Sequence, residues 1–180
     1  MSRGRYRDVL FFGVAVAVLV ADQLSKSWVR QNLALGVPWN PASWLRPVLS
    51  ITYVTNTGAA FGLFPQAGWL YTVIALAVAT SILIFYHKLG ESSWPVTLSL
   101  GLMLGGALGN NVIDRLWHGR VTDFVDLNFW PLQEWPVFNV ADSSLVVGIC
   151  IMAVLLLFSK EMQSALDGAP EEKSGEAGAQ

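Results

Sequence analysis

Four long apolar segments decide which folds are open to this chain of 180 residues. They lie at about 9–28, 69–86, 94–113 and 141–158, and each comes close to the roughly 20 residues with which a helix crosses the bilayer core. Only 13% of the residues are charged, about half the share in an ordinary soluble domain. The predicted fold class is therefore an all-α membrane protein with four transmembrane helices. Because the connections are short, residues 1–160 are expected to form a single domain.

The first apolar segment directly follows residues 3–7, which hold three arginines. A cleavable signal peptide would look similar, but a cut after Ala21 would leave the bulky Leu19 at the minus-three position, and the helical pattern continues beyond it. We therefore expect a retained helix whose N-terminus lies in the cytoplasm, as the positive-inside rule indicates. Four crossings return the C-terminus to the same side, where the acidic tail 161–180 is expected to be disordered.

The connection between the first two segments predicts β-structure at about 36–64. Residues 33–68 contain four prolines, too many for a helix, whereas the β-branched run 48–55, VLSITYVT, partly alternates as a strand does. In this topology seven of the eight tryptophans fall on the outer side, and tryptophan rings prefer the headgroup layer. We therefore expect a small extracytoplasmic β-sheet that rests on the membrane surface.

Small residues indicate how the third segment packs. Gly101, Gly105 and Gly109 lie four residues apart and share one helical face, which is typical of membrane helices that pack closely. The one cysteine, Cys150, has no partner for a disulfide within the chain and is expected to be a small buried apolar side chain.

Charged residues inside the apolar segments need an explanation. An ionised Asp at the centre of a membrane helix costs about 2.5–3.5 kcal/mol on insertion scales, so Asp22, Asp114 and Asp142 need an interfacial position, a partner or a proton. Asp22 and Lys26 lie four apart on one helical face and form a natural ion pair. Asp114 is expected to be held by the adjacent Arg115 and by the two preceding asparagines. A purely structural role in holding the helices together is about as good an explanation as a functional role for four of these residues: Asp22, Lys26, Asp114 and Arg115.

Asp123 and Asp142 fit that structural explanation less well. Asp123 lies in the segment that returns from the third span, Asp142 opens the fourth, and neither has a cation at helical spacing. If the outer ends of these spans are neighbours, the two carboxylates meet and share one proton, because both cannot ionise cheaply. Such a pair suits peptide hydrolysis, in which the ionised partner takes a proton from water and the protonated one polarises the carbonyl. We therefore predict an aspartyl protease dyad.

Other classes of function are less well supported. His87 is expected on the inner side and His118 has no Cys or His companion, which leaves too few ligands for a zinc site or a Ser-His triad. The basic residues form no cluster that would bind nucleic acid. Two rivals stay open: a proton- or cation-coupled transporter, since intramembrane Asp residues also mark ion paths, and a non-enzymatic assembly subunit. A transporter favours carboxylates at mid-bilayer and an inverted repeat, and neither is visible.

Five short blocks, taken together and in order, resemble the lipoprotein signal peptidase (signal peptidase II) family of bacterial inner membranes. They are ADQLSK at 21–26, NTGAAF at 56–61, GNNVIDR at 109–115, VTDF at 121–124 and FNVADS at 138–143. The resemblance implies four transmembrane helices with both termini in the cytoplasm, and a small β-structure on the outer leaflet. It also implies an aspartic endopeptidase without metal or organic cofactor.

The same resemblance implies the substrate, the partners and the site. The enzyme would remove the signal peptide of a prolipoprotein by cutting just before its diacylglyceryl-modified cysteine, near the outer leaflet and in contact with membrane lipid. Inhibition by globomycin is expected, and we expect a monomer. By position, Asp123 and Asp142 match the catalytic dyad. The expected supporting residues are Asn111, Asp114, Arg115 and Asn139 in the polar shell, with Asp22, Lys26 and Asn56 as further functional positions.

Overall fold

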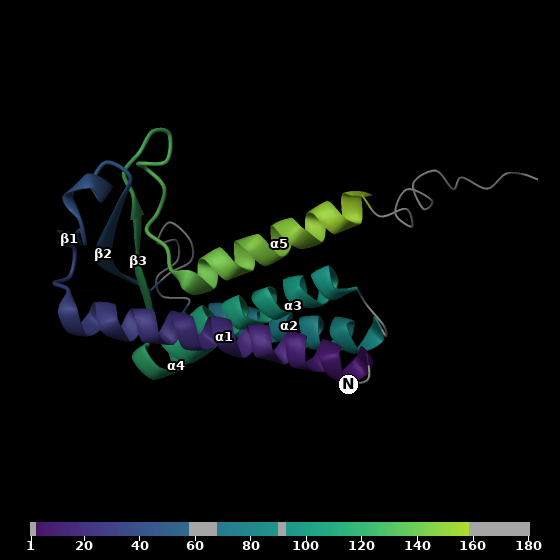
Figure 1. The fold of residues 1–180 in the computed structure, drawn as a ribbon. Coiled ribbons are helices and arrows are strands. Elements are labelled where there is room, and N and C mark those ends of the chain that lie inside the picture. The colour runs from purple at the N-terminus through teal and green to yellow at the C-terminus, as the bar shows by residue number, and fades with distance from the viewer. Residues whose placement is uncertain (1–2, 58–67, 90–92, 159–180) are drawn as a thin grey trace, which may run out of the picture.

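The computed structural model describes residues 3–57, 68–89 and 93–158, which form long helices with a small sheet at one end (Figure 1). Four helices are long and apolar enough to cross a membrane, which confirms the predicted fold class. The long helices are α1 (Arg3–Asn32), α2 (Gly68–Lys88), α3 (Trp94–Leu108) and α5 (Val140–Phe158). The π-helix η4 (Gly109–Asp114) and the short α4 (Arg115–His118) continue α3, and a 3₁₀ turn, η1 (Ser43–Leu45), lies between the first two strands.

Helix α3 lies at the centre of the bundle and contacts α1, α2 and α5. Its glycines allow this close approach. A Cβ atom added at Gly101 would lie 2.8 Å from the carbonyl oxygen of Phe11 in α1, and one at Gly105 would lie 2.7 Å from the Cβ of Val18. The predicted face of small residues is therefore confirmed, and it packs α3 against α1.

Helix α1 is longer at both ends than the apolar segment that predicts it. Asp22 and Lys26 lie inside the predicted segment, and the ion pair predicted between them is confirmed. Both side chains are fully buried in the bundle, and Lys26 Nζ lies 2.7 Å from Asp22 Oδ2. The helix continues beyond residue 28, where Val29 is also buried.

Aromatic side chains join the end of the bundle that lies far from the sheet. Phe11 of α1 stacks on Tyr86 of α2 with ring centroids 4.0 Å apart, and the Arg7 guanidinium lies 4.6 Å above the same ring. The Tyr86 hydroxyl also donates a hydrogen bond to Asp8. These contacts hold α1 and α2 together at the end farthest from the sheet.

The sheet is antiparallel, with strand order β1 (Pro38–Trp39), β2 (Leu49–Asn56) and β3 (Val121–Leu127). Strand β2 lies within one residue of the predicted strand 48–55. Strand β3 was not predicted, because its partner is about 70 residues away in the sequence. An irregularity between Ile51 and Val54 shifts the register, after which Val54 pairs with Asp123.

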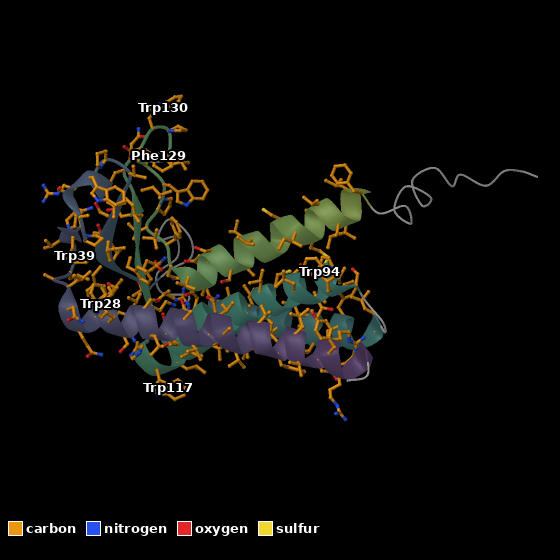
Figure 2. The ribbon with its side chains drawn as sticks, viewed as in Figure 1. Trp28, Trp39, Trp94, Trp117, Phe129 and Trp130 are labelled. Atoms are coloured by element: carbon orange, nitrogen blue, oxygen red, sulfur yellow. The ribbon has the colours of Figure 1, made fainter. Side chains whose placement is uncertain are left out.

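Aromatic rings mark the sheet end of the molecule, where Trp28, Trp39 and Trp130 lie, while Trp94 lies toward the other end (Figure 2). Cys150 is exposed on α5, so the prediction that it is buried is wrong. Helix α5 packs on the bundle through Ala141, Ser144 and Gly148 and turns its other faces outward. The tail 161–180 and most of the NTGAAF block lie outside the described residues.

Candidate active site

A cavity of about 700 Å³ lies where the sheet meets the ends of the helices, and both Asp123 and Asp142 line it. Asp123 comes from β3, and Asp142 from the first turn of α5. The polar part of the wall also includes Asn56, Tyr71, Asn110, Asn111 and Arg115, and the apolar part includes Leu127, Leu132, Trp135, Val137, Val146 and Val147. The two carboxylates predicted to form a dyad therefore face one shared space.

The fully buried Asn139 contacts both carboxylates. Its Nδ2 atom donates to Asp123 Oδ1 at 2.6 Å. Its backbone N–H donates to Asp142 Oδ2 at 3.2 Å, and its Oδ1 accepts from the backbone N–H of Asp142 at 3.0 Å. The last two bonds are a reciprocal cap at the start of α5, in which Asp142 takes the place usually held by Glu. The same residue that caps the helix therefore orients both cavity carboxylates.

Asn110 also binds one of these two carboxylates, although it is not among the predicted site residues. Its Nδ2 donates to Asp142 Oδ1 at 2.6 Å, and its Oδ1 accepts from Lys26 Nζ at 2.5 Å. The selected neighbour Asn111 instead accepts a hydrogen bond from Arg115 Nε at 3.3 Å. Both asparagines line the cavity, in a π-helical stretch of the kind found at functional sites. Two consecutive Asn residues after an apolar helix were a signal in the sequence that could have pointed to Asn110. The π-helical backbone that turns these residues toward different partners could not be predicted from the sequence.

An ionic cluster lies behind the cavity. Lys26 Nζ is 2.7 Å from Asp22 Oδ2 and 2.9 Å from Asp114 Oδ2, and all three side chains are fully buried. Gln23 Nε2 donates to Asp22 Oδ2 and Asp114 Oδ1, each at 3.0 Å. Asp114 is thus held by residues of α1, not by Arg115 and the asparagines as the sequence suggested. A buried cation between two carboxylates offsets part of the cost of burying their charges.

The ionic cluster also binds the backbone beside each residue of the dyad. Asp114 Oδ2 accepts from the backbone N–H of Thr122 at 3.2 Å, and Thr122 precedes Asp123. Asp22 Oδ1 accepts from the backbone N–H of Ala141 at 3.0 Å, and Ala141 precedes Asp142. The cluster therefore joins β3 and α5 to α1 next to the two cavity carboxylates.

The electrostatic setting favours a proton on Asp123. Burial and then the neighbouring Asp142 carboxylate raise the pKa of Asp123 from 3.8 to about 7. The hydrogen bond from Asn139, the Lys26 charge and a hydrogen bond from Asn56 oppose that rise in pKa. A pKa of about 7 places the proton exchange of this carboxyl group close to neutral pH.

The remaining predicted residues lie in the wall of the cavity. The Arg115 guanidinium lies 5.0 Å above the Tyr71 ring, and its Nη1 donates to the Thr57 carbonyl at 3.0 Å. Asn56 lies at the end of β2, opposite Val121. Among the described residues, no three His, Cys, Asp or Glu side chains are placed to hold a metal ion.

Fold and site together define a polytopic membrane protein with a pair of carboxylates, Asp123 buried and Asp142 half-buried, between its helix ends and a small sheet. The model of the family described as Signal peptidase (SPase) II matches residues 14–158. The lipoprotein signal peptidase of Shewanella baltica strain OS195 is 41% identical over 170 residues, which covers 92% of this chain and 91% of that protein. That of Syntrophomonas wolfei is 42% identical over 164 residues, or 91% of this chain and 98% of that protein. This chain therefore belongs to the signal peptidase II family and is a membrane peptidase.

Solved structures agree with this assignment. A bacterial membrane enzyme determined by the in meso method at 2.3 Å resolution superposes with a TM-score of 0.71 at 27% identity, covering 92% of each chain. A second, at 1.9 Å resolution, gives a TM-score of 0.72 at 30% identity, covering 82% of this chain and 92% of that one. The resemblance drawn from the five sequence blocks is confirmed.

Proposed function

We propose that this chain is an aspartic endopeptidase that removes the signal peptide of prolipoproteins by cutting before the diacylglyceryl-modified cysteine. One observation carries the proposal: Asp123 and Asp142, which are distant in sequence, line the same cavity and both bind Asn139. The substrate class is supported by relatives that are named lipoprotein signal peptidases.

In the proposed mechanism the dyad holds one proton and a water molecule lies between the carboxylates. The ionised carboxylate takes a proton from that water, whose oxygen attacks the scissile carbonyl carbon, while the protonated carboxylate hydrogen-bonds the carbonyl oxygen. The C–N bond then breaks and the leaving nitrogen receives a proton from the dyad. The raised pKa of Asp123 supports a proton on the pair near neutral pH.

The other polar residues would hold the dyad in place. Asn110 and Asn139 donate hydrogen bonds to its carboxylates. Asp22 and Asp114, held by Lys26, would fix the backbone beside each one. Asn56, Asn111 and Arg115 line the cavity and would contact the substrate or position the groups that do.

The shape of the cavity supports a lipid-modified substrate. Its apolar wall combines the loop after β3, including Leu132 and Trp135, with Val146 and Val147 of α5. Both valines are largely exposed on a helix that is apolar enough to span the membrane. We propose that acyl chains reach the site along this face, with the active site near the outer leaflet of a bacterial inner membrane, both termini in the cytoplasm and globomycin as an inhibitor. A monomer would suffice, because all the proposed site residues come from one chain.

The experiment uses purified full-length protein in detergent or lipid with a diacylated prolipoprotein, and follows release of the signal peptide. Wild-type protein should cleave before the modified cysteine and globomycin should block it, whereas Asp123→Asn and Asp142→Asn should be inserted and folded but inactive. Asp126→Asn is the matched control, because Asp126 lies on the same strand and binds Thr52 Oγ1 at 2.6 Å, away from the dyad. If either dyad variant cleaves at the wild-type rate, the assignment is wrong and an ion path becomes the better explanation.

A further inference from the structure

Tyr71 connects α2 to the cavity. It is the residue through which the described part of α2 lines that space, and its ring lies under the guanidinium of Arg115, 5.0 Å from the Arg115 Cζ atom to the ring centroid. Arg115 begins α4, so the contact crosses from one helix to another. An aromatic face attracts a planar guanidinium and favours one orientation of it.

The oriented guanidinium in turn contacts the end of β2. Arg115 Nη1 donates to the Thr57 carbonyl at 3.0 Å, while its Nε donates to Asn111 Oδ1 at 3.3 Å. Thr57 follows Asn56, whose side chain hydrogen-bonds to Asp123. Three contacts therefore lead from an aromatic ring on α2 to one carboxylate of the dyad.

We propose that Tyr71 is a positioning residue of the active site: its ring orients Arg115, which holds the Asn56–Thr57 end of β2 so that Asn56 stays bonded to Asp123. This inference rests on the proposed peptidase function and adds a residue to it. Tyr71 acts through Arg115 and does not itself contact the dyad.

The proposal predicts a change in the pH dependence of the reaction. The charged groups that face Asp123 are Asp142 from α5, Lys26 from α1 and Arg115 from α4. The hydrogen bond from Asn56 stabilises the ionised form of Asp123 and lowers its pKa. If Asn56 is no longer held, the pKa of Asp123 rises and the dyad keeps its proton to higher pH. The basic limb of the kcat profile then moves to higher pH, which a loss of general stability would not cause.

Tyr71→Leu tests the ring, and Tyr71→Phe keeps it. We expect Tyr71→Leu to lower kcat by about threefold to thirtyfold, the factor that corresponds to a cation–π contact, with little change in KM and a basic limb at higher pH. Tyr71→Phe should behave as wild type in both respects. Trp69→Leu is the matched control, because Trp69 lies two residues away on α2 and is 71% exposed. If Tyr71→Leu does not fold, Tyr71→Met replaces it.

A double-mutant cycle separates action through Arg115 from other effects. Arg115→Lys keeps the charge but loses the planar group, so Tyr71→Leu should cost nothing further in that background. Additive losses, a Tyr71→Phe defect as large as that of Tyr71→Leu, or a rise in KM with an unchanged pH profile would each overturn the proposal. Failure of the peptidase function is recognised separately, by a wild-type protein that does not cleave or an Asp123→Asn variant that does.

Discussion

The protein contains two pairs of neighbouring carboxylates, and the two pairs have different binding partners. Asp22 and Asp114 share the cation Lys26, at 2.7 and 2.9 Å. Asp123 and Asp142 accept hydrogen bonds from neutral amides of Asn139 and Asn110. A cation offsets part of the cost of burying two negative charges, whereas burial and the neighbouring Asp142 carboxylate raise the pKa of Asp123 to about 7. The difference explains how four Asp side chains, three of them buried and Asp142 half-buried, can serve two purposes.

The first pair also supports the second. Each carboxylate bound to Lys26 accepts the backbone N–H of the residue that precedes a member of the dyad. The charged cluster is therefore not only an attachment between helices. It also binds the backbone of β3 and α5 next to the carboxylates that these elements present to the cavity.

The largest effect on activity is expected from substitutions in the proposed dyad. Asp123→Asn and Asp142→Asn should each lower kcat by about 10²–10⁴-fold, the usual contribution of general acid–base catalysis. Neither should lower the melting temperature, because each removes a repulsion between two acids. Cleavage rates and thermal unfolding of the same preparations check both statements. A variant that loses stability in parallel with activity would show that this pair, too, is structural.

The largest effect on stability is expected from removing the cation of the other pair. Lys26→Met leaves two buried carboxylates without their cation and should reduce the free energy of unfolding by about 3–5 kcal/mol. Thermal unfolding in detergent measures the loss, with Lys88→Met as the control because Lys88 is exposed at the C-terminal end of α2. Equal melting temperatures for the two variants would mean that Asp22 and Asp114 do not depend on Lys26.

Asn110 and Asn111 are adjacent but have different partners, so substitutions of the two residues test whether the contact with Asp142 matters for activity. Asn110→Ala removes a hydrogen bond to Asp142 and should lower kcat about tenfold to hundredfold, since bonds to charged groups contribute about 1.5–3 kcal/mol. Asn111→Ala removes a bond to Arg115 and should have the smaller effect. Paired kcat measurements test this order, and the reverse order would assign the dyad contact to Asn111.

The smallest effect concerns pH. Because the folded state raises the pKa of Asp123 from 3.8 to about 7, the native protein binds more protons than the unfolded chain between these values. This group therefore favours folding at pH 4, and its contribution falls as the pH rises toward 7. Asp123→Asn should raise the melting temperature relative to wild type more at pH 8 than at pH 5. The wild-type kcat/KM should fall above about pH 7, and a profile that is flat through pH 9 would contradict the assigned proton.

Much of the fold could be predicted because it depends on local patterns. Apolar length predicts the four helices, the glycines of α3 predict its packing, and β-branched residues predict β2. Strand β3 was missed because pairing with a strand about 70 residues earlier leaves no mark on seven residues of sequence. Cys150 was misplaced because periodicity alone does not say which face of an apolar helix meets lipid.

The sequence by itself determined the number of spans, the family and the residues proposed to form the dyad, since these follow from apolar runs and from five short blocks. Only the tertiary structure decided what each carboxylate binds: Lys26 rather than Arg115 for Asp114, and Asn110 rather than Asn111 for Asp142. The physical reason is that these bonds join residues about 30 to 120 positions apart. Their partners depend on helix packing and on one π-helical turn, both of which are set by the whole bundle.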